Sequence, residues 1–196
     1  MALILALDTS TEACSCALNI NGEITEDFTV IPRQHAQNLL PMVQKLLAGK
    51  NLEFADLDAL AFGRGPGSFT GLRIAAGVTQ GIAFAANLPV IPVSTLAALA
   101  LQGYEISGCN HILSCLDARI DEVYWAVFQV VQDQIILKND EYLCKPELMQ
   151  TDFIEQESEA LTAVGNGLNY KHRFPDLLIK NIGHELPDQL PRASSI

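Results

Sequence analysis

Apolar positions in the first half of the chain form either short runs or longer stripes that recur about every 3–4 residues. Short apolar runs bounded by turn residues predict buried strands, whereas the recurring stripes predict amphipathic helices. Asn21-Gly22, between the second and third runs, is typical of a tight hairpin turn. The predicted strands are residues 3–8, 14–20, 24–30, 57–62 and 90–93. The predicted helices are residues 35–47, 70–86 and 94–101.

The same order of elements begins again in the second half of the chain. Asp8 ends the first strand of the first half, and Asp117 ends the first strand of the second half. The repeat indicates an α/β protein with a duplicated topology, so we expect one lobe over residues 1–103 and another over residues 104–196. Beyond about residue 174 the pattern fades. The elements expected in the second half are strands 111–117, 122–131, 135–137 and 160–164, and a helix over 146–157.

The charge balance argues against direct binding to nucleic acid. Twelve Lys and Arg residues face 23 Asp and Glu residues, which leaves a net charge of −11. Affinity for nucleic acid comes largely from basic side chains that neutralise phosphates. If this protein acts on RNA, we therefore expect another protein to hold the RNA.

The sequence also indicates the cellular compartment in which the protein is expected. No apolar run is long enough to span a bilayer, and the first residues lack the basic segment of a signal peptide. The five cysteines are odd in number and contain no C-x-x-C pair, which favours buried, reduced thiols in a cytoplasmic protein. They are Cys14, Cys16, Cys109, Cys115 and Cys144.

The glycine-rich stretch GRGPGSFTG at residues 63–71 is the most distinctive local motif. It follows a predicted strand and opens a predicted helix, which is a common place for an anion site. It lacks the Lys-Ser/Thr that closes a P-loop, and it does not spell G-x-S-x-G. Two interpretations stay open: a phosphate cradle, or a tight turn whose glycines allow close packing.

Two acidic turns at strand ends are the next candidates. Asp8-Thr9-Ser10 ends the first strand, and Asp117-Ala118-Arg119 ends its counterpart in the second lobe. In a duplicated fold these turns would face each other across a cleft and could bind a nucleotide phosphate with Mg²⁺. They could equally be two turns capped by Asp side chains.

The predicted helix over residues 70–86 is unusually rich in small residues. Gly77 and Gly81 lie four residues apart and so share one face, although a glycine inside a helix costs about 1 kcal/mol relative to alanine. Small residues permit the close approach of a second helix. Because small and apolar residues surround more than one face, we expect this helix to contact a partner protein as well as its own sheet.

Several of these segments together resemble the TsaB/YeaZ family. The strongest match is GRGPGSFTGLRI at residues 63–74, and five shorter segments follow the family in the same order. These segments are LALDTST at 5–11, HAQNLLP at 35–41, IPVS at 91–94, DARIDEVYW at 117–125 and GNG at 165–167. The resemblance covers about residues 3–174 and implies the actin/Hsp70-like (ASKHA) fold of two ribonuclease-H-like lobes with mixed sheets. Family members usually continue with a further helix and a Pro-x-Tyr-Leu-Arg-like tail, so the second lobe is expected to be truncated relative to them.

The resemblance implies a non-catalytic scaffold that binds its paralogue TsaD. That pair would transfer threonylcarbamoyl to N6 of adenosine 37 in ANN-decoding tRNAs (the t6A modification). TsaD carries a metal-binding His-x-x-x-His pair where this chain has Thr95 and Leu99, neither of which supplies an imidazole. The four histidines of this chain show no metal-ligand spacing. No catalytic residue, metal or metallopeptidase activity is therefore expected here.

The partners and cofactors implied are those of the family. ATP and metal are expected on TsaD, with no cofactor bound by this subunit alone. The ATPase TsaE joins the assembled complex, tRNA is reached only through the complex, and the free chain forms a homodimer. An independent ASKHA-type ATPase or small-molecule kinase is the alternative, although only Arg64, Arg73 and Arg119 could neutralise its phosphates.

The residues expected to act fall into two groups. The helices over 35–47 and 70–86 are expected to pack against the matching pair on TsaD. The expected interface residues are His35, Leu39, Val43, Leu46, Leu72, Ala75, Ala76, Gly77 and Thr79. The residues expected near a nucleotide, if one binds, are Asp8, Thr9, Ser10, Gly65, Gly67, Asp117, Arg119, Gly165 and Gly167.

Overall fold

The computed structural model describes residues 2–154 and 160–196 and divides into two compact units. The first unit contains residues 1–98 and 191–196, and the second contains residues 99–190. The expected boundary lay between residues 103 and 104. The observed division falls inside helix α3 (Thr95–Ser107), and the last six residues pack on the first unit instead of the second. Among the described residues, no helix combines the length and apolar character that a membrane span requires.

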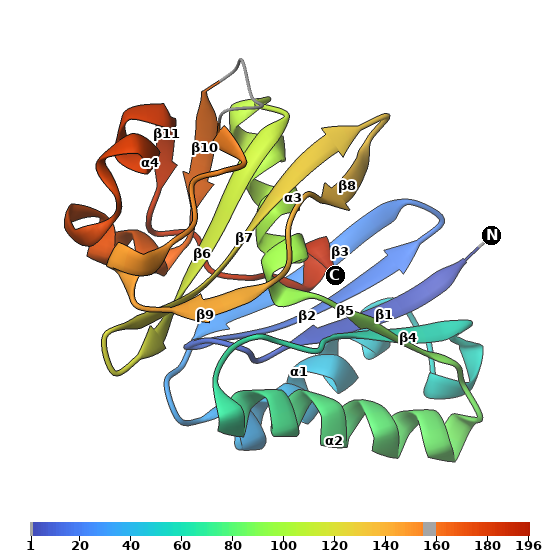
Figure 1. The fold of residues 1–196 in the computed structure, drawn as a ribbon. Coiled ribbons are helices and arrows are strands. Elements are labelled where there is room, and N and C mark those ends of the chain that lie inside the picture. Colours follow the sequence, from blue (N-terminus) through green and yellow to red (C-terminus); the bar gives the residue numbers. More distant parts are fainter. Residues whose placement is uncertain (1, 155–159) are drawn as a thin grey trace. The chain divides into compact units, whose positions relative to one another are not determined.

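The first unit is a five-stranded mixed sheet in the order β3-β2-β1-β4-β5 (Figure 1). β1 pairs antiparallel with β2 and parallel with β4. The long helices α1 and α2 cover one face of this sheet, as Figure 1 shows. Its elements are β1 (Leu3–Asp8), β2 (Ala13–Ile20), β3 (Glu23–Val30), α1 (His35–Ala48), η1 (Phe54–Asp56), β4 (Ala59–Gly63), α2 (Phe69–Ala86) and β5 (Val90–Val93).

Strand alternation explains how both faces of the first sheet are covered. Leu5 and Leu7 point to the helical side and are fully buried there, whereas Ala6 between them points to the opposite side. Small residues on that opposite side leave room for the short turn η5 (Ala193–Ser195). The C-terminal segment therefore completes the core of the first unit.

The second unit is a six-stranded mixed sheet in the order β11-β10-β6-β7-β8, with β9 paired to β7. Trp125 on β7 is buried at its centre and stacks on Tyr142 at a ring-centroid distance of 5.0 Å. Its elements are β6 (His111–Arg119), β7 (Glu122–Val131), β8 (Gln134–Leu137), β9 (Tyr142–Cys144), η2 (Pro146–Leu148), β10 (Leu161–Val164), η4 (Asn166–Arg173), α4 (Asp176–Asn181) and β11 (Ile182–Leu186).

One predicted helix is wrong in its described part. Residues 146–157 were expected to form one α-helix, but η2 ends at residue 148, and Met149 is already extended with a ψ of 131°. Pro146, Met149 and Ile154 are buried. Burial of these scattered side chains in the second core outweighs the helical pattern. The part of the prediction over residues 155–157 lies outside the described residues.

Candidate partner interface and strand-end turns

Helix α1 turns its apolar stripe toward its own sheet. Leu39 and Val43 are fully buried in the first core, and the ring nitrogen Nε2 of His35 lies 3.2 Å from the carbonyl oxygen of Ala13. The stripe is therefore explained by the fold of the first unit. Its buried members are His35, Leu39, Met42, Val43, Leu46 and Leu47.

This burial corrects the expected orientation of the interface residues. Six of the nine are buried within the chain, namely His35, Leu39, Val43, Leu46, Ala75 and Thr79. Of the other three, Leu72 and Ala76 are half-buried, and Gly77 is exposed. A regular apolar stripe shows that one face of a helix is covered. The sequence does not say whether the protein's own sheet or a partner covers it, because both require the same stripe.

The exposed face of α2 has a different character. Phe84 is 92% exposed and Phe69 is 69% exposed, while Arg73 is the only charged residue in the helix. The guanidinium of Arg73 lies 3.8 Å from the centroid of the Phe69 ring. Depletion of charge with exposed aromatic residues is characteristic of interface cores, and here it occurs in a chain of net charge −11.

Gly77 and Gly81 lie on this same exposed face. A Cβ atom added to either glycine would meet nothing within 4 Å. The fold of the first unit therefore does not require glycine at these two positions, although glycine lowers the stability of a helix interior. Their presence is explained if another chain approaches the helix closely.

A cavity of about 480 Å³ lies at the C-terminal ends of α1 and α2, beside η1. Its walls are mainly apolar, and Phe84 precedes two of its lining residues directly in the sequence. The lining residues are Gln44, Leu47, Ala48, Leu52, Glu53, Phe54, Ala55, Ala85 and Ala86.

The first strand-end turn, Asp8-Thr9-Ser10, is buried. Asp8 is fully buried, and its Oδ1 atom accepts hydrogen bonds from the backbone N–H of Ser10 at 2.9 Å and from its hydroxyl at 2.7 Å. The Oδ2 atom has no hydrogen-bond partner among the described residues. Burial raises the pKa of Asp8 to about 6, and the two bonds from Ser10 oppose that rise.

The glycine-rich turn packs directly on the Asp8 turn. The N–H of Ser68 donates to the carbonyl of Ser10 at 2.7 Å, and the hydroxyl of Thr9 donates to the carbonyl of Gly71 at 2.7 Å. A Cβ on Gly67 would overlap the Ser10 carbonyl, and one on Gly71 would overlap the Thr9 carbonyl. These contacts favour the interpretation of the motif as a tight turn.

The same stretch uses its helix-capping groups internally. Ser68 caps α2 by accepting a hydrogen bond from the N–H of Gly71 at 3.3 Å. Gly65 has a φ of +102°, a conformation that favours glycine, and a Cβ there would press on the side chain of Leu72. Two of the backbone groups that would cradle a phosphate thus already have intramolecular partners.

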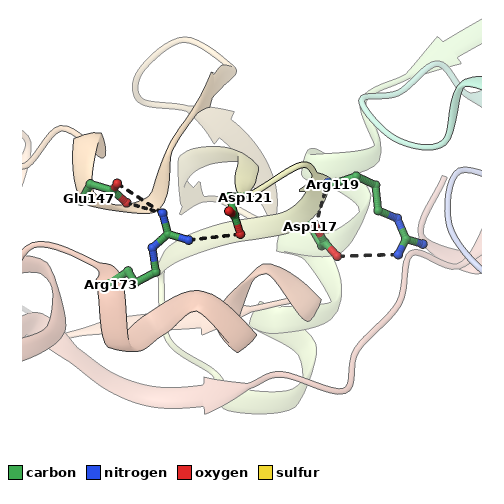
Figure 2. A network of polar contacts seen from close by, with 5 residues as sticks. All are labelled: Asp117, Arg119, Asp121, Glu147 and Arg173. Carbon is green, nitrogen blue, oxygen red and sulfur yellow. Dashed lines mark hydrogen bonds and ion pairs between the residues drawn. The ribbon is translucent and has the colours of Figure 1, made fainter.

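The second strand-end turn is built in a similar way. The Oδ1 atom of Asp117 accepts a hydrogen bond from the N–H of Arg119 at 2.7 Å, and Asn166 Oδ1 accepts one from the N–H of Asp117 at 3.0 Å. A Cβ added to Gly165, which has a φ of +109°, or to Gly167 would overlap the backbone of Cys115. Figure 2 shows Asp117 beside Arg119 in this turn. Whether the two strand-end turns face each other across a cleft stays a prediction.

Four cysteine thiols are less acidic than a free thiol because they are buried. Burial raises the pKa of Cys14 to about 11 and that of Cys16 to about 12, and it also raises the pKa values of Cys115 and Cys144. These thiols are therefore neutral at pH 7. Within residues 2–154 and 160–196, no group of three or more His, Cys, Asp and Glu side chains could hold a metal ion.

Two mixed α/β units with a repeated strand order define a two-lobe protein of the actin/Hsp70-like (ASKHA) fold class. A family model described as TsaD, tRNA N6-adenosine threonylcarbamoyltransferase, matches residues 25–184. The tRNA threonylcarbamoyladenosine biosynthesis protein TsaB of Escherichia coli (strain K12) is 43% identical over 175 residues, which cover 89% of this chain and 74% of that protein. The chain belongs to the TsaB (YeaZ-type) family.

Two further comparisons agree with this assignment. TsaB of Haemophilus influenzae is 49% identical over 132 residues, which cover 67% of this chain and 55% of that relative. This chain therefore matches only about half the length of that protein. The solved structure of YeaZ from Pseudomonas aeruginosa superposes with a TM-score of 0.93 at 42% identity, covering 100% of this chain and 88% of that chain.

The sequence did not identify several residues that the structure places at the surface of the protein. Phe69 and Phe84 lie in the helix whose richness in small residues the sequence showed. Both are exposed because the opposite side of α2 is the side that packs on the sheet. Arg173 and Glu147 lie far apart in the sequence yet form a salt bridge with an Nη2–Oε2 distance of 3.0 Å. Two residues so far apart leave no local pattern, so the sequence carried no signal for this pair.

Proposed function

We propose that this chain is a partner subunit in the biosynthesis of threonylcarbamoyladenosine in tRNA, and that it binds TsaD through the exposed faces of α1 and α2. The names of its relatives support the pathway. The main support for this docking surface is the exposed face of α2, which has few charges and where Gly77 and Gly81 have open space above them. The catalytic partner then holds ATP, metal and the ANN-decoding tRNA, and TsaE joins the assembled complex.

The net charge of −11 supports a division of labour between the two proteins. An acidic chain contributes little to holding phosphates, so the tRNA is bound by the partner. The role of this subunit is to stabilise the catalytic partner in its active arrangement. A helix pair of this length suffices for an interface of about 800 Å² per protein.

The independent ATPase is the weaker candidate. An ASKHA enzyme needs acidic side chains accessible to Mg²⁺ and phosphate groups, but Asp8 is fully buried and bonded to Ser10. Its neighbouring glycines pack on backbone atoms instead of leaving a cradle. We expect the purified chain to bind no stoichiometric Zn²⁺ or Fe²⁺ and to hydrolyse no ATP. Elemental analysis and a phosphate-release assay, each with and without TsaD, measure both.

The docking surface is tested by placing a charge on it. Gly77→Glu introduces a carboxylate at an exposed position of α2 without a clash inside the chain, and it replaces a glycine by a better helix former. The variant should fold at least as stably as the parent, yet bind TsaD about a thousandfold more weakly, because the charge would be buried unpaired at several kcal/mol.

Gln134→Glu is the matched control, since it adds the same carboxylate at an exposed position on β8 of the second unit. Thermal unfolding checks stability, and titration calorimetry with purified TsaD measures affinity. If folded Gly77→Glu binds TsaD and supports t6A formation as the parent does, the α2 face is not the interface and the proposal fails.

A further inference from the structure

The turn between β6 and β7 has an unexpected residue at its tip. Arg119, Ile120 and Asp121 have φ values of 68°, 52° and 60°. Ile120 and Asp121 occupy the two central positions of the turn, where positive φ is characteristic of type I′. Asn-Gly is the favoured sequence for this turn, and the β2–β3 hairpin uses it at Asn21 and Gly22. Isoleucine is poorly suited to the first position, because its branched Cβ crowds a left-handed backbone.

Burial inside the chain does not compensate for this strain. Ile120 is 93% exposed, which is the highest value among the exposed large hydrophobic residues in the described part of the chain. Neither turn preference nor core packing therefore accounts for isoleucine at this position. When the fold does not require a strained residue, its presence indicates a contact with another molecule.

A network of charged side chains fixes the tip from both ends (Figure 2). The Arg173 guanidinium on η4 lies 3.3 Å from Oδ1 of Asp121 and also donates to both oxygens of Glu147 on η2, at 3.2 and 3.0 Å. At the other end, Asp117 Oδ1 accepts the Arg119 N–H at 2.7 Å. The turn is thus tied directly to η4 and, through Arg173, to η2, while the Asp117–Arg119 hydrogen bond closes its other end.

We propose that the β6–β7 tip is a docking element, in which Ile120 enters an apolar socket on a protein partner whose rim is basic. Charge complementarity supports this occupant. The tip and its anchors carry four carboxylates, on Asp117, Asp121, Glu122 and Glu147, against three cations, the guanidinium groups of Arg119 and Arg173 and the ammonium group of Lys145 beside Glu147. This excess of negative charge attracts a Lys- and Arg-rich surface and repels RNA.

The partner follows from the proposed function, on which this step rests. A protein that holds tRNA must present basic residues, and in the proposed complex that protein is TsaD. The tip therefore supplies a second point of contact on TsaD, carried by the second unit and separate in sequence from the α2 face.

The test uses a substitution whose effects on stability and on binding have opposite signs. Ile120→Asn places a favoured residue in the type I′ turn, so the melting temperature should stay equal or rise. Loss of one buried isoleucine from the contact should weaken TsaD binding about ten- to a hundredfold. Gln132→Asn is the control, because Gln132 occupies the equivalent first position of the β7–β8 turn, with φ values of 51° and 60° at residues 132 and 133.

The measurement is titration of the full chain and each variant with purified TsaD, followed by photocrosslinking from a benzophenone amino acid at position 120. A stable Ile120→Asn with weakened binding, a normal Gln132→Asn and a crosslink to a TsaD peptide rich in Lys or Arg support the proposal. Unchanged binding of Ile120→Asn, or a crosslink to tRNA when it is added, overturns it. Gly77→Glu separates the two hypotheses: if it alone weakens binding, the tip proposal fails, and if only Ile120→Asn does, the α2 interface fails.

Discussion

The carboxylate of Glu26 on β3 binds the guanidinium of Arg192, which lies 166 residues further along the chain, at an Nε–Oε2 distance of 2.8 Å. The other oxygen of Glu26 accepts a hydrogen bond from the N–H of Ser194 at 3.0 Å. Arg192 also lies over the Phe28 ring, 4.3 Å from its centroid. These bonds hold the C-terminal segment on the first unit, where Ala193 joins the small-residue side of the core.

The first prediction concerns this clamp. Arg192→Ala should lower the free energy of unfolding by about 1–2 kcal/mol, because it removes charge-assisted hydrogen bonds to a largely buried carboxylate. Lys50→Ala is the control, since Lys50 reaches Glu23 on the same strand only at 3.5 Å and the pair is exposed. That control should change stability by less than about 0.5 kcal/mol. Urea denaturation measures both, and equal losses in the two variants would contradict the prediction.

The second prediction concerns Asp8 and pH. Its pKa in the folded protein is raised to about 6 from an ordinary value of 3.8. The folded state therefore holds this proton more tightly than the unfolded state, so the contribution of Asp8 to stability falls as pH rises from about 4 to 6. Above that window the ionised, buried carboxylate should cost on the order of 3 kcal/mol.

Asp8→Asn removes this ionisation while keeping an oxygen that can accept the bonds from Ser10. We expect the variant to be at least as stable as the parent at pH 8 and to lose the fall in stability between pH 4 and 6. Urea denaturation at a series of pH values gives both curves. A variant that keeps the full slope of the parent would show that another group titrates there.

The third prediction compares two glycines of α2. Gly77→Ala should stabilise the protein by about 0.5–1 kcal/mol, because alanine is the better helix former and its Cβ meets open space. Gly71→Ala should destabilise it by about 1–3 kcal/mol, because its Cβ would overlap the Thr9 carbonyl. Thermal unfolding of both variants measures the difference. Shifts of the same sign would show that the packing of the glycine-rich turn is not as described.

The fourth prediction concerns self-association. A surface that fits a paralogue of the same fold is related to the paralogue's own surface, so the free chain should form a two-fold homodimer through α1 and α2. Phe84→Ser should shift it toward monomer, because it removes an aromatic group that is 92% exposed in the isolated chain. Analytical ultracentrifugation over concentrations up to tens of micromolar, a range suited to a weak interface, checks this. A monomeric parent over the whole range would contradict it.

The amino-acid pattern determined the order of the elements in the first unit and the family. Strands 3–8, 90–93 and 122–131 were predicted with the bounds that the structure gives, and the helices over 35–47 and 70–86 were correct to within one residue at each end. The repeated strand order also predicted two α/β lobes, and the family resemblance implied that their sheets are mixed. Such features depend on local periodicity, which a single segment of chain contains in full.

Only the tertiary structure decided which face of each helix is available. The sequence marks Leu39 and Val43 as members of an apolar stripe, but its own sheet and a partner produce the same stripe, and here the sheet covers it. The sequence also does not distinguish the glycines of α2. A Cβ added to Gly71 would overlap backbone atoms, whereas one added to Gly77 would meet nothing within 4 Å. The contacts of Glu26 with Arg192 and of Asp121 with Arg173 were also invisible, because pairs brought together by chain folding leave no short-range pattern.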